Sequence, residues 1–464
     1  MTIGATRPER PLRVAIVGSG PSGFYAAGQL LSHKGRAIEV DIYDRLPTPW
    51  GLVRGGVAPD HPKIKSVSRV YEKIARMPGF RFHGSVEVGR DLSHDELSAW
   101  YDAVLYAVGT ATDRRSGIPG EDLAGSWSAT EFVGWYNGHP DFSDLQFDLS
   151  GRRAIVIGNG NVAVDVARML SLTEDELRGT DIAEHALEAL VGAKVEEIFV
   201  LGRRGPEQAA FTNPELRELG VMGDADVIVD PGDLQIPDEL REEPLDATAR
   251  RNVELLHEYA RTPRAGRAKR IVLRFLTSPV EILGDGRVER LRVVRNALRD
   301  ENGRLRASAT DREELIDCSL VFRAIGYTGL PLTGLPFDER RGVIPNENGR
   351  VTGLAATYVA GWIKRGPSGV IGTNKKCASD TVKSLLADIE SGGLGAGDVP
   401  GPDEVERCLR ERRPDLVDYP GWERIDRAEK AAGELQGRPR VKFTRTAELL
   451  EAAGVRAVAR DPAG

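Results

Sequence analysis

Short runs of apolar residues recur along this chain, and segments with apolar positions at helical spacing follow several of them. Residues 14–17 and 154–157 are two such runs, and each has the pattern of a buried strand. Residues 24–31 and 164–170, which come shortly after them, carry an apolar face at helical spacing and predict helices. The pattern therefore predicts two strand–turn–helix units within one α/β chain.

Further apolar runs indicate how the two units are connected. Residues 38–43 have the pattern of the second strand of the first unit. Residues 102–109 and 315–327 have buried-strand patterns and lie on either side of the second unit. We interpret them as the points where the chain crosses between domains, and residues 357–361 as the strand on which it returns. The second domain is therefore predicted to be inserted into the first.

A glycine-rich turn directly follows each of the first two apolar runs. The first turn is Gly18-Ser19-Gly20-Pro21-Ser22-Gly23, and the second is Gly158-Asn159-Gly160-Asn161-Val162-Ala163. A strand that ends in such a turn brings its backbone against a pyrophosphate at a helix N-terminus, where unpaired N–H groups and the helix dipole favour negative charge. One turn of this kind is weak evidence, but two in this context predict two dinucleotide sites.

The residues at the end of each second strand distinguish the two dinucleotides. Asp44 follows the strand at 38–43 and can accept hydrogen bonds from a ribose diol, which suits FAD. At the corresponding place the second unit carries Arg203 and Arg204, whose guanidinium groups match a 2′-phosphate and favour NADP over NAD. The alternative for the two arginines is a solvated pair on a surface turn.

The second unit is longer than usual between its glycine turn and Arg203, where roughly 20 residues are expected. An acidic, helix-forming insertion at 172–190 explains the extra length, with Thr173 or Asp181 as a helix N-cap. Such an insertion lengthens the connection without changing the strand order.

These assignments give the expected architecture. The fold class is α/β, with two Rossmann-like dinucleotide-binding domains and the NADP domain inserted into the FAD domain. The FAD domain spans residues 1–110 and 327–464, and the NADP domain spans residues 111–326. In the C-terminal tail, a glycine-rich linker begins at residue 392 and a short surface helix is expected at 445–452.

Length and charge restrict the class of protein further. A chain of 464 residues, 41% hydrophobic and 29% charged, exceeds what one core usually supports. The net charge of -7 argues against general nucleic-acid affinity, and no apolar run approaches the roughly 18 residues that a membrane span needs. The first dozen residues resemble neither a signal peptide nor a transit peptide. We therefore expect a cytoplasmic protein without membrane insertion.

Cysteine and histidine positions exclude several redox and metal classes. Cys318, Cys377 and Cys408 are far apart in the sequence, whereas a dithiol reductase or an integral iron–sulfur cluster needs closely spaced thiols. The seven histidines show no metal-binding spacing. We expect no bound metal, and any iron–sulfur cluster must belong to a partner protein.

Three stretches of the chain are distinctive enough to identify a family. They read LPTPWGLVR at 46–54, GVAPDHPK at 56–63 and GWIKRGPSGVIGTN at 361–374. In these stretches the chain closely resembles the adrenodoxin reductase family, including its bacterial NADPH–ferredoxin reductases. The resemblance extends from the first strand to about residue 442.

The resemblance implies residues for both cofactors. Besides the glycines Gly18, Gly20 and Gly23, it implies that FAD contacts Ser22, Asp44, Leu52, Val86, Trp362, Gly369, Val370 and Ile371. For NADP it implies contacts from Arg114, Asn159, Gly160, Asn161, Val162, Arg203, Arg204, Glu215 and again Gly369. Relatives with glutamate at the ribose position have one methylene more than Asp44, so the contact there is expected to differ in detail.

The stretch at 361–374 has a chemical reason to lie at the flavin. Gly366, Gly369 and Gly372 would let the backbone approach a flat ring, and a helix beginning near Thr373 would direct N–H donors toward the electron-rich edge of the flavin. Trp362 could shield the ring or could simply pack in a core. The family resemblance favours the first reading for Trp362.

His61 is the one histidine inside a distinctive stretch. One hypothesis makes His61 catalytic, as part of the route by which protons or electrons leave the reduced flavin. The alternative is a loop histidine that forms hydrogen bonds with the backbone.

The combined prediction is an NADPH-dependent ferredoxin reductase. Hydride passes from NADPH to the flavin, and two single-electron steps then reduce an iron–sulfur ferredoxin. We expect a monomer that docks this acidic partner on a basic face. One candidate is the cluster Arg261, Arg264, Arg267, Lys269 and Arg270, for which a solvated loop is the alternative.

Two other functional classes stay open on the sequence. A flavin monooxygenase would use the same two nucleotides, although its F-x-G-x-x-x-H motif is absent between the two units. A non-enzymatic flavoprotein that senses NADPH would bind both nucleotides without turnover.

Overall fold

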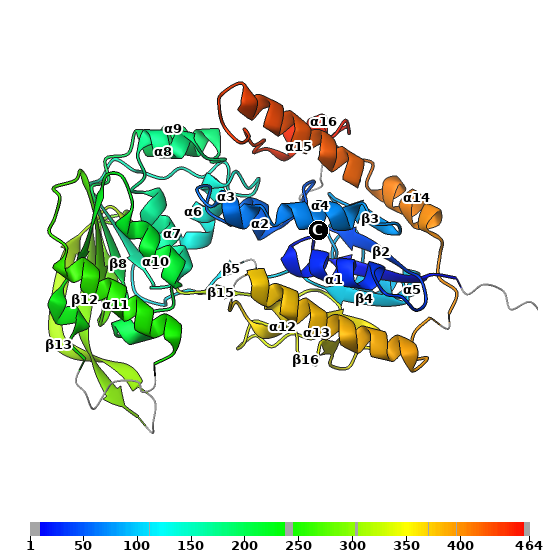
Figure 1. Ribbon diagram of the computed structural model, residues 1–464, viewed down its shortest axis with the longest axis horizontal. Coiled ribbons are helices and arrows are strands. Elements are labelled where there is room, and N and C mark those ends of the chain that lie inside the picture. Colours follow the sequence, from blue (N-terminus) through cyan, green and yellow to red (C-terminus); the bar gives the residue numbers. More distant parts are fainter. Residues whose placement is uncertain are drawn as a thin grey trace, which may run out of the picture. The chain divides into compact units, whose positions relative to one another are not determined.

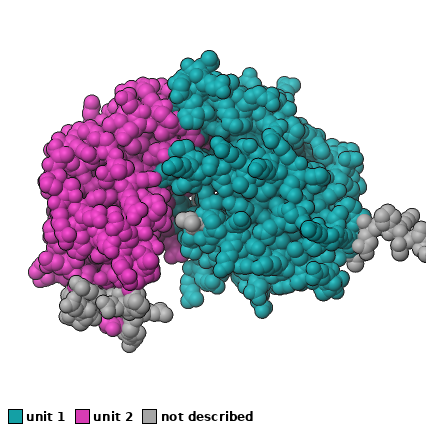
Figure 2. All heavy atoms as spheres, viewed as in Figure 1, with its two compact units in different colours: residues 1–57, 61–112, 327–464 teal, residues 58–60, 113–326 magenta. Residues whose placement is uncertain are grey.

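The computed structural model describes most of the chain as two compact units (Figures 1 and 2). The first unit takes in residues 1–57, 61–112 and 327–464, and the second takes in residues 58–60 and 113–326. The described residues within these ranges are 10–110, 112–236, 245–301, 305–369, 371–395 and 397–458. Val370, which was assigned to the FAD site from the sequence, lies outside them.

A seven-stranded sheet forms the centre of the first unit. In spatial order its strands are β16 (Asn346–Glu347), β17 (Arg350–Val351), β18 (Thr357–Val359), β4 (Ala103–Tyr106), β1 (Leu12–Val17), β2 (Ile38–Tyr43) and β3 (Phe80–His83). The strands from β18 to β3 are parallel, and β16 and β17 pair antiparallel at one edge. The order reverses between β1 and β4, and ligands of such sheets bind beyond the carboxyl ends of the strands at that point.

Helices cover both faces of this sheet. They are α1 (Pro21–Leu31), α2 (Leu52–Gly55), α3 (Pro62–Lys65), α4 (Ser68–Ala75), α5 (His94–Trp100), α12 (Trp362–Arg365), α13 (Ile371–Glu390), α14 (Pro402–Arg412), α15 (Tyr419–Glu434) and α16 (Thr446–Ala452). Because side chains alternate along a strand, Leu12, Val14 and Ile16 of β1 pack in one core with α1, α4, α13, α15 and α16. Ala15 and Val17 pack in a second core with α5 and α14.

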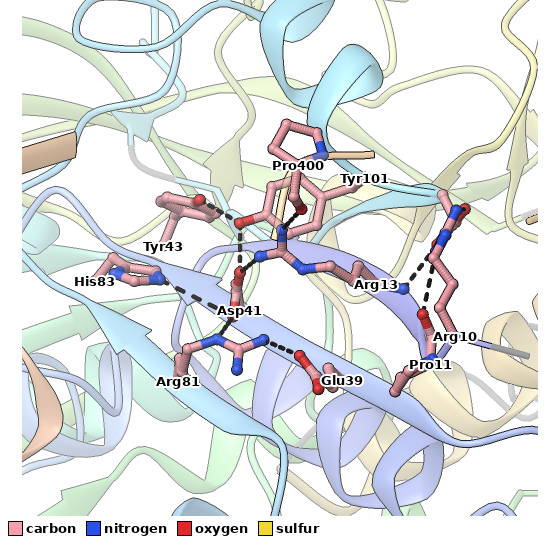
Figure 3. Close-up of polar contacts among 11 residues, drawn as sticks. Arg10, Pro11, Arg13, Glu39, Asp41, Tyr43, Arg81, His83, Tyr101 and Pro400 are labelled. Carbon is pink, nitrogen blue, oxygen red and sulfur yellow. Dashed lines mark hydrogen bonds and ion pairs between the residues drawn. The ribbon is translucent and has the colours of Figure 1, made fainter. Parts of the chain in front are cut away.

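A buried ionic network joins three strands of the first unit (Figure 3). The carboxylate of Asp41 on β2, 1% exposed, accepts hydrogen bonds from Arg13 on β1, Arg81 on β3 and Tyr101, each at 2.5 Å. Burial raises the pKa of Asp41, but the neighbouring cationic groups and the hydrogen bond from Tyr101 outweigh burial and hold that pKa below its ordinary value. The ionised carboxylate of Asp41 therefore links β2 to both of its neighbours, β1 and β3.

The second unit is built on a six-stranded parallel sheet. In spatial order its strands are β6 (Ser126–Ser128), β14 (Leu320–Arg323), β7 (Arg153–Ile157), β8 (Glu197–Leu201), β10 (Lys269–Arg274) and β9 (Ala225–Val229). The helices are α6 (Ala129–Tyr136), α7 (Asn161–Met169), α8 (Glu174–Arg178), α9 (Glu184–Val191), α10 (Asn213–Gly220) and α11 (Ala247–Arg261), with 3-10 turns η1 (Pro206–Gln208) and η2 (Pro231–Leu234).

Different layers cover the two faces of the second sheet. Val156 and Ile198 pack against helices that include α6, α7 and α11. Ile155 and Ile157 instead pack against an antiparallel sheet. Its strands are β11 (Thr277–Leu283), β12 (Arg290–Asp300) and β13 (Leu305–Asp317). Apart from residues 58–60, which also belong to the second unit, the chain changes unit at the short strands β5 (Thr112–Asp113) and β15 (Tyr327–Thr328).

Several predicted elements are confirmed. Strand β2 has the predicted bounds 38–43. In the insertion, Thr173 is the N-cap of α8, because its side chain accepts a hydrogen bond from the N–H of Glu176. Asp181 is not an N-cap, since the next helix, α9, follows Ala183. The return strand β18 lies within the predicted 357–361.

Two predictions about elements were wrong. Residues 315–327 are not one strand: they contain the end of β13, a turn at 318–319, β14 and the start of β15. Apolar periodicity does not reveal that this turn moves the chain from one sheet to another. The helix at 445–452 is present as α16 but is not a simple surface helix, because Leu449 and Leu450 are 1% and 3% exposed and pack in the core of the first unit.

Among the described residues, no helix combines the length and the apolar character needed to cross a membrane.

Candidate functional site

The first glycine turn is closely packed where its strand ends. The N–H of Gly18, which follows β1, donates to the carbonyl of Tyr43 at 2.8 Å. A Cβ at Gly18 would lie 2.5 Å from the carbonyl oxygen of Ala107, and one at Gly23 would lie 2.1 Å from that of Gly18. Glycine is therefore required at both positions by the neighbouring backbone.

The next part of the same turn is open. A Cβ at Gly20 would meet nothing within 4 Å, and Gly20 is the N-cap of α1 without a side-chain hydrogen bond to the helix end. Ser22, in the first turn of α1, is buried. The arrangement presents backbone N–H groups of the helix N-terminus to a free space, which fits a pyrophosphate.

Asp44 lies beside this turn, directly after β2. Its carboxylate accepts hydrogen bonds from the N–H of Ser19 at 3.1 Å, from the hydroxyl of Ser19, and from the N–H of Leu46 at 2.9 Å. Burial raises the pKa of Asp44, and these hydrogen bonds oppose that rise. A carboxylate has about four acceptor positions, so Asp44 can still accept a ribose hydroxyl. Val86, 1% exposed, donates its N–H to the Asp44 carbonyl at 2.9 Å.

Residues 50–52 approach the turn from another part of the sequence. The N–H of Trp50 donates to the Ser19 carbonyl at 3.0 Å, and a Cβ at Gly51 would lie 2.9 Å from the Cα of Gly20. Leu52, the next residue, begins α2 and is 43% exposed. Such exposure of a leucine suits a residue that an apolar ring would cover.

A third segment reaches the start of α1 from the C-terminal half. Gly361 has φ +81°, and a Cβ there would lie 2.4 Å from the hydroxyl of Ser22. The neighbouring Trp362 stacks on Tyr327 with ring centroids 5.4 Å apart, and its buried indole N–H has no acceptor among the described residues. The unpaired N–H fits the presence of a polar ligand at this place.

The helix expected near Thr373 begins two residues earlier, as α13 at Ile371. Gly369, which precedes it, has φ +78° and is exposed. On α13, the thiol of Cys377 accepts a hydrogen bond from the N–H of Gly361 at 3.3 Å. Cys377 is isolated from other cysteines in the sequence, and nothing in its local pattern indicates this contact.

The second glycine turn, in the second unit, repeats the arrangement. Gly158 has φ +137°, and a Cβ there would lie 2.2 Å from the carbonyl oxygen of Ala324. Gly160 is the N-cap of α7 without a side-chain cap, and a Cβ there would meet nothing within 4 Å. This turn is also packed at its first glycine and open at its second.

Two residues of this turn fix a second loop beside it. The side-chain oxygen of Asn161 accepts the N–H of Thr212 at 2.8 Å, and the carbonyl of Asn159 accepts the N–H of Ala210 at 2.9 Å. Val162, which follows, is half-buried. Asn159 and Asn161, which are predicted to contact NADP, therefore also hold residues 210–212 beside the glycine turn.

Arg203 and Arg204 follow β8 as predicted, and both side chains are exposed. Their carbonyls are held by the Asn296 amide at 2.8 Å and the Leu276 N–H at 3.0 Å, respectively. Neither guanidinium has an ion pair or hydrogen bond within the part of the chain that the structure describes. Arg114 is exposed as well, with its backbone N–H bonded to the Gly326 carbonyl at 2.9 Å.

Glu215 differs from the other predicted NADP residues, because it is buried in an ionic cluster. It accepts a hydrogen bond at 3.1 Å from Arg168, which is 2% exposed. Arg168 also bonds Asp60 at 2.6 Å and Asp165 at 2.8 Å. Burial lowers the pKa of Arg168, but these carboxylates outweigh it and hold that pKa above its ordinary value. Sequence reasoning missed Arg168, since an arginine inside a helix has no motif of its own.

His61 is buried and is the N-cap residue of α3, where its carbonyl accepts the N–H of Lys65 at 3.1 Å. This geometry is compatible with both hypotheses for His61, so its catalytic role stays a prediction.

The basic cluster at 261–270 is smaller than the sequence indicates. Arg267 donates to the carbonyl of Ala225 at 3.0 Å, Lys269 donates to that of Leu170 at 2.7 Å, and Arg270 pairs with Glu197 at 2.7 Å. Of the five, Arg261 and Arg264 are exposed, and the other three are half-buried. Three of the charges hold the second unit together, which weakens the docking hypothesis for this cluster.

Comparison with known proteins identifies the family of this chain. Residues 12–200 match the pyridine nucleotide-disulphide oxidoreductase family. The chain is 52% identical to the NADPH-ferredoxin reductase FprA of Mycobacterium leprae, over 96% of this chain and 99% of the relative. It is 41% identical to the mitochondrial NADPH:adrenodoxin oxidoreductase of Arabidopsis thaliana, over 96% of each chain.

A solved structure gives the same result at the level of the fold. Mycobacterium tuberculosis FprA in complex with NADPH matches with a TM-score of 0.91 at 51% identity, covering 96% of this chain and all of that one. Identity of this extent over almost the whole length establishes the family. The chain therefore belongs to the adrenodoxin reductase-type family of NADPH–ferredoxin reductases.

Proposed function

We propose that this protein is an NADPH-dependent ferredoxin reductase that uses FAD. It takes a hydride from NADPH and delivers single electrons to an iron–sulfur ferredoxin. One observation carries the proposal: each unit has an open glycine turn, one beside the half-buried carboxylate of Asp44 and the other beside two free guanidinium groups. Relatives over 40% identical across 96% of the chain are named as reductases of this kind.

The residues of the first unit fit FAD. The pyrophosphate would lie at Gly20 and the N-terminus of α1, and the ribose at Asp44. Leu52 and Trp362 would contact the ring system, with Gly369 and Ile371 at its far side. FAD, when bound, accepts two electrons as a hydride and releases them one at a time. The protein positions the nicotinamide for this transfer and needs no nucleophile of its own.

The residues of the second unit fit NADPH. The pyrophosphate would lie at Gly160 and the N-terminus of α7, and the 2′-phosphate between Arg203 and Arg204. We accordingly assign residues 1–110 and 327–464 to the FAD domain and residues 111–326 to the NADP domain.

We assign the ferredoxin to a basic face of the first unit rather than to the cluster at 261–270. Lys63, Arg69 and Lys73 on α3 and α4 are exposed, and their ammonium and guanidinium groups have no ion pair within the described ranges. Ile64 and Val70, 40% and 45% exposed, supply apolar area among these charges. Charge complementarity around an apolar centre suits an acidic protein partner.

Charge reversal distinguishes the two faces. Arg69→Glu with Lys73→Glu should reduce ferredoxin-dependent turnover about tenfold at low salt and weaken its salt dependence, while reduction of a small dye stays unchanged. The matched variant, Arg261→Glu with Arg264→Glu, should behave as wild type. If the variant at Arg261 and Arg264 loses ferredoxin-dependent turnover and the variant at Arg69 and Lys73 does not, the docking site lies on the second unit.

We also propose that the protein is a cytoplasmic monomer. The three cysteines form no disulfide, and Cys318 and Cys377 are buried, as expected for a protein kept in a reducing compartment.

Steady-state assays test the function itself. Purified protein with bound FAD should reduce ferredoxin over many turnovers with NADPH. Binding of both nucleotides without turnover toward any acceptor would favour the NADPH-sensing flavoprotein. Rapid peroxide release with little ferredoxin reduction would favour the monooxygenase.

A further inference from the structure

Helix α15, in the C-terminal part of the chain, carries a buried carboxylate that the proposed reaction does not use. The side chain of Glu429 is 0% exposed. It accepts hydrogen bonds from both terminal nitrogens of Arg54 at 2.8 and 2.5 Å, from Arg440 at 3.0 Å and from the N–H of Phe443 at 3.0 Å. All four acceptor positions of the carboxylate are thereby filled.

Among these partners, Arg54 connects Glu429 to the proposed FAD site, because it belongs to the segment 46–54 that includes Leu52. It lies in α2, two residues after Leu52. Its guanidinium forms a two-pronged pair with Glu429 and also lies over the ring of Trp422, 5.4 Å from the centroid. Trp422 and Glu429 are seven residues apart on α15 and so face the same side of that helix.

A second set of contacts completes the link. Trp422 packs edge-on against Trp50, with ring centroids 4.8 Å apart. The ammonium of Lys442 donates to the carbonyl of Arg54 at 3.4 Å. Residues 50–54 are therefore held both by α15 and by Lys442 of the segment that follows α15.

The held segment is backbone-strained and touches the pyrophosphate turn. Trp50 has φ +85°, an uncommon value for a residue other than glycine, and Gly51 has φ +50°. Such conformations persist when the surroundings enforce them. The same two residues contact Ser19 and Gly20, as described above, so a displacement of α2 would be transmitted to the dinucleotide site.

We propose that Glu429 is a positioning residue for FAD: through Arg54 it holds residues 50–55 in the conformation that places Leu52 at the flavin and Gly51 against the pyrophosphate turn. This inference rests on the proposed FAD site. It gives the C-terminal part of the chain, in which sequence reasoning found only a linker and a surface helix, a role in cofactor binding.

The test measures FAD affinity rather than activity. Flavin release from the holoprotein is followed by the rise in flavin fluorescence, together with the visible absorption band of the bound flavin. Glu429→Gln keeps the shape but removes the charge, and should raise the Kd for FAD about tenfold or more and alter the absorption band. Arg54→Lys keeps the charge but loses the two-pronged geometry, and should raise the Kd less.

The matched control is Glu423→Gln on the same helix. Glu423 is 40% exposed and has one distant contact, with Arg76 at 3.6 Å, so this variant should bind FAD as wild type does. If Glu429→Gln does not fold, Arg54→Lys carries the comparison alone.

The outcomes separate this inference from the proposed function. A wild-type protein that binds FAD, with Kd and spectrum unchanged in both Glu429→Gln and Arg54→Lys, would overturn the inference and leave the function intact. A lower melting temperature of the apoprotein with unchanged FAD affinity would likewise reduce Glu429 to a structural role. A wild-type protein that binds no FAD would overturn both.

Discussion

At the scale of single residues, the proposed preference for NADPH over NADH depends on charges that the fold leaves unpaired. The side chains of Arg203 and Arg204 are exposed at the end of β8 and have no partner within the described part of the chain, whereas Arg168 of the same unit pairs with several carboxylates. Two unpaired guanidiniums in that position favour a ligand with an additional phosphate.

Replacing Arg203 and Arg204 together by alanine should therefore raise the KM for NADPH about tenfold or more and leave the KM for NADH unchanged, because hydrogen bonds to a charged group are lost with one substrate alone. Steady-state reduction of a dye with each nucleotide measures this. The control is Arg287→Ala, at a position 70% exposed on the same unit. Equal loss with both nucleotides would contradict recognition of the 2′-phosphate.

The buried carboxylate of Asp41 leads to a prediction about pH. Its pKa in the folded protein lies below the ordinary value of 3.8, so its contribution to stability is complete above that pH and is lost as the pH falls through the lower, folded value. Asp41→Asn should lower the free energy of unfolding by about 3 kcal/mol near neutral pH, since Arg13 and Arg81 lose their buried partner.

Urea unfolding of wild type and Asp41→Asn at several pH values measures this difference, which should shrink below about pH 4. Glu39→Gln is the matched control, because Glu39 also pairs with Arg81, at 2.6 Å, but is 25% exposed and should contribute less than about 1 kcal/mol. A difference that is constant over the whole range would show that the charge of Asp41 is not what stabilises the sheet.

At the scale of elements, each glycine turn combines a packed position with an open one. The position of each turn was predictable from the sequence, because a strand–turn–helix unit shows both apolar periodicity and a glycine-rich turn. The contacts that fix the turns could not be predicted in this way. Gly158 packs on Ala324, more than 160 residues away, and Gly361 packs on Ser22. Pairs this far apart leave no local pattern in one sequence.

The two glycines of the second turn should respond differently to alanine. Gly158→Ala combines φ +137° with a Cβ 2.2 Å from a backbone oxygen, and should destabilise the second unit by about 2 kcal/mol or more. Gly160→Ala meets no protein atom within 4 Å and should fold normally, but its methyl group would enter the space expected for NADPH. Thermal unfolding and NADPH titration separate the two effects; normal NADPH affinity in a folded Gly160→Ala variant would contradict the proposed site.

At the scale of the whole molecule, the family, its cofactors and both glycine turns could be predicted from the sequence, because the long specific stretches and the turns are local. The role of the C-terminal part could not. Glu429 and Arg54 are 375 residues apart and meet through α15 and α2, and neither residue stands in a motif that indicates a partner. The basic cluster at 261–270 is a different case, because it was predicted as one surface from charges that are adjacent in the sequence. In the fold, Lys269 and Arg270 instead bind different partners within the second unit.

The central claim is that one unit holds FAD and the other delivers a hydride from NADPH. Anaerobic titration of the purified protein with NADPH and with NADH, followed by the visible absorption of the flavin, tests it most directly. We expect NADPH to bleach the flavin at far lower concentration than NADH, and oxidised ferredoxin to restore the absorption. Protein without bound flavin, or bleaching without preference between the two nucleotides, would contradict the account.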